Sequence, residues 1–391
     1  MKTIFFSSRS CVMLLIGLAV FSSCSSVTDS DPISSNFGEF VMVPNFDATN
    51  AISTNLVATN TGLYLTVDNI NQAGDERICR YDLNQNSILS GTWQQVNNPS
   101  PGNDPFQYYT PINYFSEATS NHDLFITPVY YAFQTPVYQT INMATGNVLA
   151  EEDVPTHDFN PSNMNSFGTI IKDDTGQDWA VFRGGLVSNS NQHIIKYRTS
   201  GGTFNQVGSI TAQGSLYFTA SLISTDLLAL SYQEKKLFII KPSGQIVTIN
   251  LSNYYDGSLA GLDYKTKFRF STYGTFFIFQ NKVIKVDGNQ TATVFHTIDI
   301  TSSPLGGDFC VDNEYLFATD GIRKELGGFN VEVNIIPNIP STNNQEIILE
   351  YIDKTNFFKI GSLETSTNPA DKYIYVLGND GRILIISKKY I

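Results

Sequence analysis

The chain has 391 residues, with 24 lysines and arginines against 36 aspartates and glutamates, so its net charge is −12. Hydrophobic residues make up 41% of it, enough to bury a core, which excludes global disorder. The acidic balance, with no compensating basic cluster, leads us to expect no nucleic-acid partner. Aromatic residues are frequent at 13% and charged residues scarce at 15%, a composition that favours β-structure.

The start of the chain is typical of a secretory signal peptide. Lys2 and Arg9 supply its positive charges, and residues 12–21 form an apolar run. A membrane-spanning helix needs about 20 apolar residues, and this run is roughly half that length. We therefore interpret it as the hydrophobic region of a signal.

Two serines directly precede Cys24. This arrangement resembles the lipobox of Gram-negative bacterial lipoproteins, although Phe21 stands where that family usually has leucine. The resemblance implies that residues 1–23 are removed and that Cys24 is lipidated, so that a lipid anchor holds the chain in a membrane. It also implies a cell-envelope location, as an outer-membrane lipoprotein that is periplasmic or surface-exposed. The alternative is an ordinary secretory signal in which Cys24 is incidental.

Residues 24–36 are polar and aperiodic, and we expect a flexible tether there. After it, one motif repeats: an alternating apolar run, a turn and a second apolar run. The mean interval is about 52 residues, and a four-stranded sheet with its turns needs roughly 40 to 50, so each repeat should hold four strands. The sixth repeat is the least distinct, which leaves six or eight repeats open. The seven runs begin at residues 63, 124, 179, 228, 276, 315 and 373.

The two ends of this region fit each other. The last repeat lacks a fourth strand, because only five residues follow residue 386, and an unassigned strand, residues 39–43, precedes the first repeat. The pattern resembles a seven-bladed β-propeller of the WD40-like or YVTN-like type, in which an N-terminal strand often completes the last blade. We predict an all-β propeller over residues 37–391, closed by residues 39–43.

Long loops concentrate on one predicted face, between blades and within the central strand pairs of blades 1 to 4. Long loops on a rigid repeat scaffold usually carry binding. Their aromatic rings could stack on sugars while amides and acids bind hydroxyls, and the same groups suit a peptide or protein partner. Alternatively, the rings pack the loops onto the blades. The candidate ligand-binding residues are Phe106, Tyr108, Tyr109, His157, Asp158, Tyr254 and Tyr255.

Catalytic and metal-binding motifs are sparse. The sequence has no G-x-S-x-G, C-x-x-C or H-E-x-x-H pattern, and we predict no metal and no cofactor. His157 beside Asp158 is the histidine best placed for chemistry in a loop. Residues 173–178 miss the EF-hand spacing and predict a plain turn. Paired acids for glycoside cleavage could still converge near a central funnel. The candidates are Asp68, Asp104, Asp158, Asp256 and Asp308.

Besides Cys24, the predicted mature chain contains two cysteines, Cys79 and Cys310, which could form a disulfide in an oxidising compartment. The repeat register places them in different blades, so we expect two buried thiols rather than a disulfide. Taken together, the sequence predicts a lipid-anchored, non-catalytic module that binds a glycan, peptide or protein. The alternatives are a propeller hydrolase or lyase acting on carbohydrate, and a structural subunit of an envelope complex.

Overall fold

The chain divides into two units, Met1–Gly38 and Glu39–Ile391, and the fold is that of the second. Among the described residues, no helix is long and apolar enough to cross a membrane. The computed structural model describes residues 38–42, 51–58, 62–69, 77–82, 93–95, 124–129, 137–142, 148–153, 169–173, 175–183, 192–199, 201–214, 216–262, 267–298, 308–312, 315–319, 326–330, 360–365, 373–378 and 382–387.

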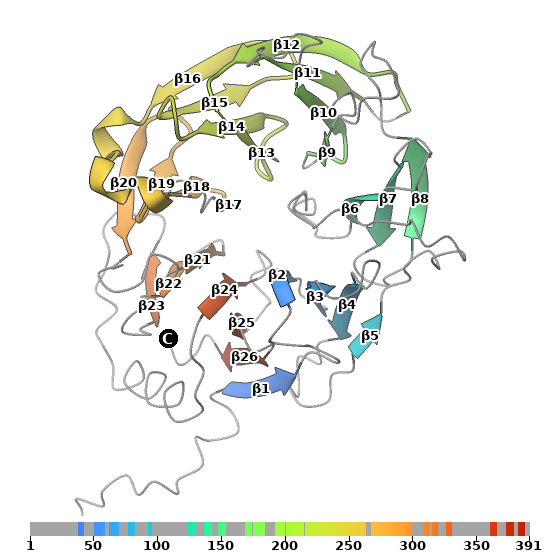
Figure 1. Ribbon diagram of the computed structural model, residues 1–391, viewed down its shortest axis with the longest axis vertical. Helices are drawn as coiled ribbons and strands as arrows, with labels where there is room; N and C mark the ends of the chain where they lie inside the picture. Colours follow the sequence, from blue (N-terminus) through green and yellow to red (C-terminus); the bar gives the residue numbers. More distant parts are fainter. Residues whose placement is uncertain are drawn as a thin grey trace, which may run out of the picture. The chain divides into compact units, whose positions relative to one another are not determined.

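The described strands form seven sheets, five of four strands and two of three, and strands consecutive within a sheet pair antiparallel (Figure 1). The first sheet contains β2 (Ala51–Ala58), β3 (Gly62–Asn69), β4 (Arg77–Asp82) and β5 (Trp93–Gln95). The second contains β6 (Leu124–Val129), β7 (Val137–Asn142) and β8 (Val148–Asp153). The third contains β9 (Thr169–Lys172), β10 (Asp178–Arg183), β11 (Gln192–Arg198) and β12 (Asn205–Thr211).

The remaining sheets continue in chain order. The fourth contains β13 (Leu216–Ala220), β14 (Leu227–Ser231), β15 (Lys236–Ile240) and β16 (Ile246–Asn250). The fifth contains β17 (Phe268–Ser271), β18 (Gly274–Phe279), β19 (Lys282–Val286) and β20 (Ala292–Thr297). The 3-10 helices η3 (Ser252–Tyr254) and η4 (Gly257–Leu262) lie between these two sheets in the chain. The sixth contains β21 (Asp308–Val311), β22 (Tyr315–Thr319) and β23 (Leu326–Asn330). The seventh contains β24 (Ile360–Glu364), β25 (Tyr373–Gly378) and β26 (Arg382–Ser387), together with β1 (Gly38–Met42).

The prediction of an all-β chain is confirmed for the described residues, and five of the seven described sheets have the predicted four strands. Each predicted strand pair appears as two adjacent antiparallel strands of one sheet, including the least distinct one near residue 315, which is β22 and β23. The strand predicted at residues 39–43 is β1, and the sheet order β1-β26-β25-β24 places it beside the last strand. Cys79 on β4 and Cys310, buried on β21, lie in different sheets, as the register predicts.

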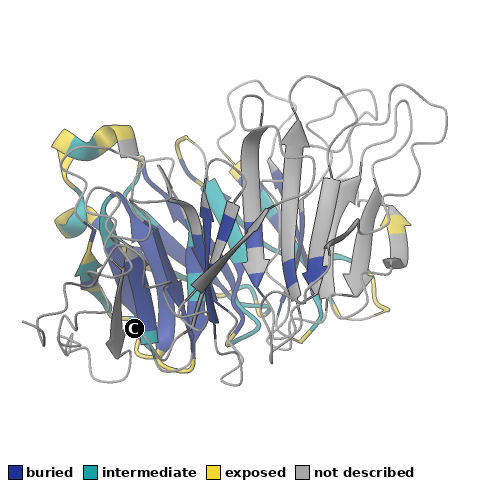
Figure 2. Ribbon diagram, turned by 90° about the horizontal axis from the view of Figure 1, so that it is seen from below, coloured by how far each residue is buried: buried dark blue, intermediate teal, exposed yellow. Residues whose placement is uncertain are grey.

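The central strands are apolar because both of their faces are buried (Figure 2). On β14, Leu227 and Ala229 belong to the core shared with the third sheet, whereas Leu228 and Leu230 belong to the core shared with the fifth. Side chains alternate across a strand, so a continuous apolar run serves two cores at once. Fully burying a leucine contributes about 1.5–3 kcal/mol, so these shared cores hold neighbouring sheets together.

The same principle joins other sheets. The core between the fifth and sixth sheets includes Phe276 and Phe309, and a further core includes Leu63 of the first sheet and Tyr375 of the seventh. The strands β17 and β21 contact each other, and so do β21 and β24. Residues on these three strands can therefore meet, which matters for the charged cluster described below.

Glycine is required at the tight turn between β15 and β16. Gly244 has φ of +87°, and its N–H donates to the Lys241 carbonyl oxygen at 2.8 Å. A Cβ there would lie 2.6 Å from the Val207 carbonyl oxygen of the third sheet. The turn thus combines a left-handed backbone with a close approach to the neighbouring sheet, and both need glycine.

Deleting residues 38–42 should lower the melting temperature by several degrees. The deletion removes β1 and leaves β26 with an unpaired edge, so the last sheet loses its inter-strand hydrogen bonds on that side. Thermal melts followed by circular dichroism measure the effect. Deleting residues 27–31, a segment of equal length upstream, is the control and should leave the melt unchanged; equal melting temperatures for the two deletions would contradict a structural role for β1.

Candidate functional site

Most of the predicted ligand-binding residues lie outside the described part of the chain. Phe106, Tyr108, Tyr109, His157 and Asp158 fall in segments that the structure leaves undescribed, as does Cys24. Their predicted roles stay predictions. Of the long predicted loops, the one after β16 is described over residues 251–262 and contains the last two candidates, Tyr254 and Tyr255.

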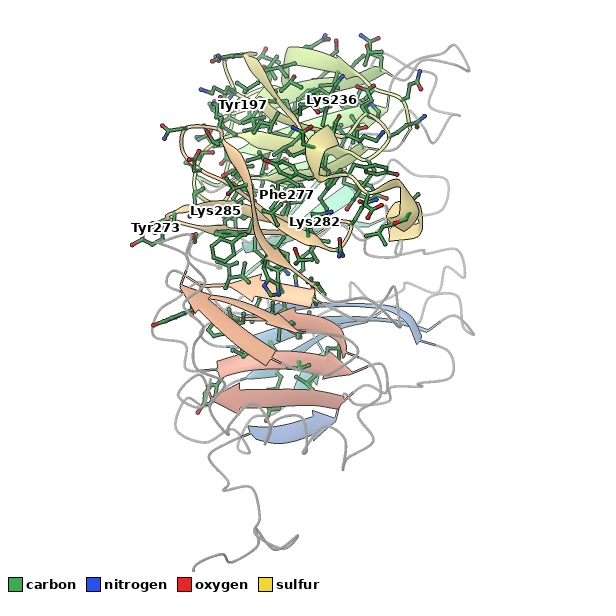
Figure 3. All side chains as sticks on the ribbon, turned by 90° about the vertical axis from the view of Figure 1, so that its left-hand side faces the viewer. Tyr197, Lys236, Tyr273, Phe277, Lys282 and Lys285 are labelled. Atoms are coloured by element: carbon green, nitrogen blue, oxygen red, sulfur yellow. The ribbon has the colours of Figure 1, made fainter. Side chains whose placement is uncertain are left out.

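Tyr254 fastens this loop to the fifth sheet at two atoms. Its hydroxyl donates to the Ala292 carbonyl oxygen on β20 at 2.6 Å. The Lys282 ammonium on β19, labelled in Figure 3, donates to the Tyr254 carbonyl oxygen at 2.8 Å. The half-buried ring packs against the core between the fourth and fifth sheets. Tyr254 therefore links the loop to the scaffold with both its side chain and its backbone.

Tyr255 is also turned towards the protein. Its ring centroid lies 6.0 Å from that of buried Phe279, and the Lys235 ammonium lies 4.6 Å from the centre of the Tyr255 ring. Phe279 in turn stacks on Tyr232 at 5.0 Å. The two tyrosines thus hold the loop down on the blades, the arrangement given above as the alternative to ligand contact.

A buried glutamine fixes the middle of the loop. Gln280, in the turn between β18 and β19, accepts the Asp256 N–H on its side-chain oxygen at 2.8 Å. Its amide nitrogen donates to the Asp256 carbonyl oxygen at 2.9 Å. The Leu251 N–H donates to the Lys235 carbonyl oxygen at 2.8 Å. Because both neighbouring sheets hold its backbone, the loop has little freedom to rearrange.

What the loop and its neighbours expose is polar. Asp256 uses one carboxylate oxygen to accept the Ser258 N–H and hydroxyl at 2.9 and 2.7 Å, which lowers the pKa of Asp256. Gln233, in the turn between β14 and β15, donates to the Gln213 side-chain oxygen at 3.3 Å. We call the exposed side chains of this area the polar loop surface: Gln213, Gln233, Ser252, Asn253, Asp256 and Ser258.

A second cluster is buried and charged, and sequence reasoning did not predict it. The Lys267 ammonium, just before β17, donates to the Asp308 carboxylate of β21 at 2.7 Å and lies 3.0 Å from the Glu364 carboxylate of β24. Arg269 pairs with the same Glu364. The side chains of Lys267, Asp308 and Glu364 are only 12%, 5% and 5% exposed. We call these four residues the ionic cluster.

Backbone bonds complete the ionic cluster. Lys267 also donates to the Leu363 carbonyl oxygen at 2.6 Å, and the Leu363 N–H donates to Asp308 at 2.7 Å. Burial acts to lower the pKa of Lys267, but the Asp308 and Glu364 carboxylates outweigh it and raise that pKa above its ordinary value. The cluster thus joins the first strands of three successive sheets through neutralised charges.

The structure also locates the other chemical candidates. Asp308 was a candidate for a catalytic acid pair, and it is held in the ionic cluster. Asp173 is buried and accepts the Thr175 and Gln177 N–H groups, as expected of a turn between β9 and β10. Burial and the Asp173 carboxylate raise the pKa of the bonded Tyr197 hydroxyl to about 12. Within the described residues, no group of three metal-ligating side chains could hold a metal.

No protein-family model matches the sequence, and no curated protein matches it. Among solved structures, a streptogramin B lyase gives a TM-score of 0.50 at 11% identity, covering 90% of this chain and 97% of its own. Virginiamycin B lyase from Staphylococcus aureus gives 0.49 at 13%, with coverage of 90% and 98%. BamB from Moraxella catarrhalis gives 0.40 at 10%, with coverage of 91% and 98%. These neighbours are β-propeller-like proteins.

The chain has a propeller-like fold. At 11% identity the likeness to the streptogramin B lyase shows the fold alone, because unrelated activities share this architecture. The other two superpositions are too loose to carry an argument about function.

Replacing Lys267 by methionine should destabilise the protein by about 3 kcal/mol, because it leaves two buried carboxylates without their ammonium partner. Urea unfolding of the two proteins measures the difference. Lys236→Met is the matched control: Lys236 pairs with Glu234 at 2.8 Å but its side chain is 41% exposed, so the loss should stay within about 1 kcal/mol. Equal losses in the two variants would contradict a stabilising ionic cluster.

The same comparison has a pH dependence. The pKa of Lys267 is raised in the folded state. Its contribution to the free energy of unfolding is therefore fully present below the ordinary lysine pKa of about 10.4 and is lost as the pH rises towards the folded-state pKa. The stability gap between wild type and Lys267→Met should therefore be constant from pH 7 to 9 and narrow above about pH 10.4. A gap that widens in alkali would refute the assignment.

Proposed function

We propose that the chain is a lipid-anchored cell-envelope propeller that binds a partner without performing chemistry on it. One observation carries the proposal: the loop of residues 251–258 is fixed by two sheets while it exposes a row of polar side chains. A loop held on a rigid scaffold loses little entropy when a partner binds, which favours recognition.

The propeller would have seven blades and close on itself. Seven sheets are described, β1 lies beside β26, and a shared apolar core contains Leu63 of the first sheet and Tyr375 of the seventh. These contacts support a ring in which residues 38–42 complete the last blade. The ring would give the loops of one face a common, fixed platform.

The membrane anchor is proposed from the sequence. The signal-like residues 1–23 and Cys24 support lipidation, an outer-membrane location and a tether over residues 24–36. Several acyl chains anchor a protein stably, since each buried methylene contributes about 0.8 kcal/mol. The folded unit would then meet its partner at the membrane surface.

Binding is favoured over catalysis by the state of the inner carboxylates. Asp308 and Glu364, which lie on first strands, are both ion-paired with Lys267. A carboxylate held in this way is a poor general acid, because the neighbouring ammonium stabilises its ionised form. A carbohydrate lyase or hydrolase stays the second candidate from the sequence, with its acids drawn from the loops around His157 and Asp158.

The test is a binding screen of the full chain in detergent, immobilised and exposed to oligosaccharides, peptides and solubilised envelope proteins. We expect a ligand whose affinity falls about tenfold in Asn253→Ala/Ser258→Ala, since each lost hydrogen bond contributes about 0.5–1.5 kcal/mol. The control, Asn289→Ala/Ser243→Ala, removes the same two groups from exposed turns at the opposite ends of the same sheets and should bind normally.

Two outcomes would overturn the proposal. Failure of every ligand class to bind would remove the recognition role. Chemical breakdown of a bound oligosaccharide, detected by mass spectrometry, would establish the lyase or hydrolase instead.

A further inference from the structure

The charges around the polar loop surface are already engaged within the protein. Lys236 pairs with Glu234 at 2.8 Å, and this contact lowers the pKa of Glu234. Lys282 donates to the Tyr254 carbonyl oxygen, and Lys235 lies over the Tyr255 ring. Asp256 accepts two hydrogen bonds from Ser258. Recruiting these groups for a charged ligand would break contacts that hold the loop.

The exposed groups that remain are neutral amides and hydroxyls. Gln213, Gln233 and Asn253 each carry an amide, which both donates and accepts, and Ser252 and Ser258 carry hydroxyls. Sugar hydroxyls also donate and accept, so amides and hydroxyls match them in both directions. The only exposed acid in the set, Asp256, can add an acceptor for a hydroxyl without needing a cation.

The tyrosines of the loop do not supply a platform for stacking. The Tyr255 ring contacts the Lys235 ammonium and the Phe279 ring. The Tyr254 hydroxyl donates to the Ala292 carbonyl oxygen. Recognition at this surface therefore depends on hydrogen bonds from a fixed backbone rather than on an aromatic platform. A fixed backbone favours binding because a protein–ligand hydrogen bond replaces hydrogen bonds to water and so contributes little net free energy. That small gain is kept only when the donors and acceptors need not be ordered on binding.

We infer that the polar loop surface binds an uncharged, hydroxyl-rich glycan. This inference rests on the proposed function and narrows its ligand to one chemical class. A polyanion would have to displace the contacts that Lys235 and Lys282 make with the loop, and Lys236 is paired with Glu234. The one exposed acid of the surface, Asp256, already accepts two hydrogen bonds from Ser258.

The test is a titration of the full chain in detergent with neutral gluco-, manno-, galacto- and xylo-oligosaccharides, and with oligogalacturonate, polyglutamate and polylysine as charged probes. We expect a neutral oligosaccharide to bind, with an affinity that changes less than about twofold between 50 and 500 mM salt, because no ion pair is formed. Gln233→Ala and Asn253→Ala should each weaken it about threefold to tenfold.

Two control substitutions should leave both the fold and the affinity for the neutral sugar intact. Gln245→Ala removes an exposed amide from the turn at the opposite end of the fourth sheet and should leave the affinity unchanged. Lys236→Gln removes a charge from the turn next to the loop and should also leave the affinity unchanged. Its only expected effect is a small loss of stability, because the ion pair with Glu234 is removed.

The outcomes separate this inference from the proposed function. Binding of a charged probe through Gln233 and Asn253, or an affinity for a neutral sugar that falls tenfold with salt, overturns the neutral-glycan assignment while leaving a binding module. Binding of a peptide but of no neutral sugar does the same. Failure of every probe and every envelope protein to bind overturns both.

Discussion

The structure depends on central strands that must bury both of their faces. On β14, alternate residues such as Leu227 and Leu228 enter different cores, each shared with a different neighbouring sheet. A sheet built in this way cannot hide its apolar surface alone, so each one needs a neighbour on either side. Two neighbouring sheets can then hold the loop between them, as Lys235, Gln280 and Lys282 hold the loop after β16.

Charged residues appear inside this apolar arrangement at one described place that spans three sheets. Lys267, Arg269, Asp308 and Glu364 neutralise one another on the first strands of the fifth, sixth and seventh sheets. Burying charges costs free energy, and the contacts recover it only when every partner is in position. The ionic cluster therefore favours one relative arrangement of these sheets over other compact arrangements, in addition to any stability that it contributes.

The strands could be predicted from the sequence because their signal is local: alternating apolar runs and glycine turns recur at a regular interval. The ionic cluster could not be, since Lys267 and Asp308 are 41 residues apart and Arg269 and Glu364 are 95 apart. The loop was located correctly, but the orientation of its rings depends on Lys282 and Ala292, which lie 28 and 38 residues from Tyr254. Sequence showed where the aromatic residues lie and not which way they face.

The central claim is that the loop after β16 is held rigidly before any partner arrives, and hydrogen–deuterium exchange tests it directly. The N–H groups of Leu251, Tyr254 and Asp256 donate respectively to the Lys235 carbonyl oxygen, the Leu251 carbonyl oxygen and the Gln280 side-chain oxygen. They should exchange at least about tenfold more slowly than in a free peptide of residues 250–262, and Gln280→Ala should accelerate Asp256 selectively. Exchange as fast as in the free peptide would contradict the account.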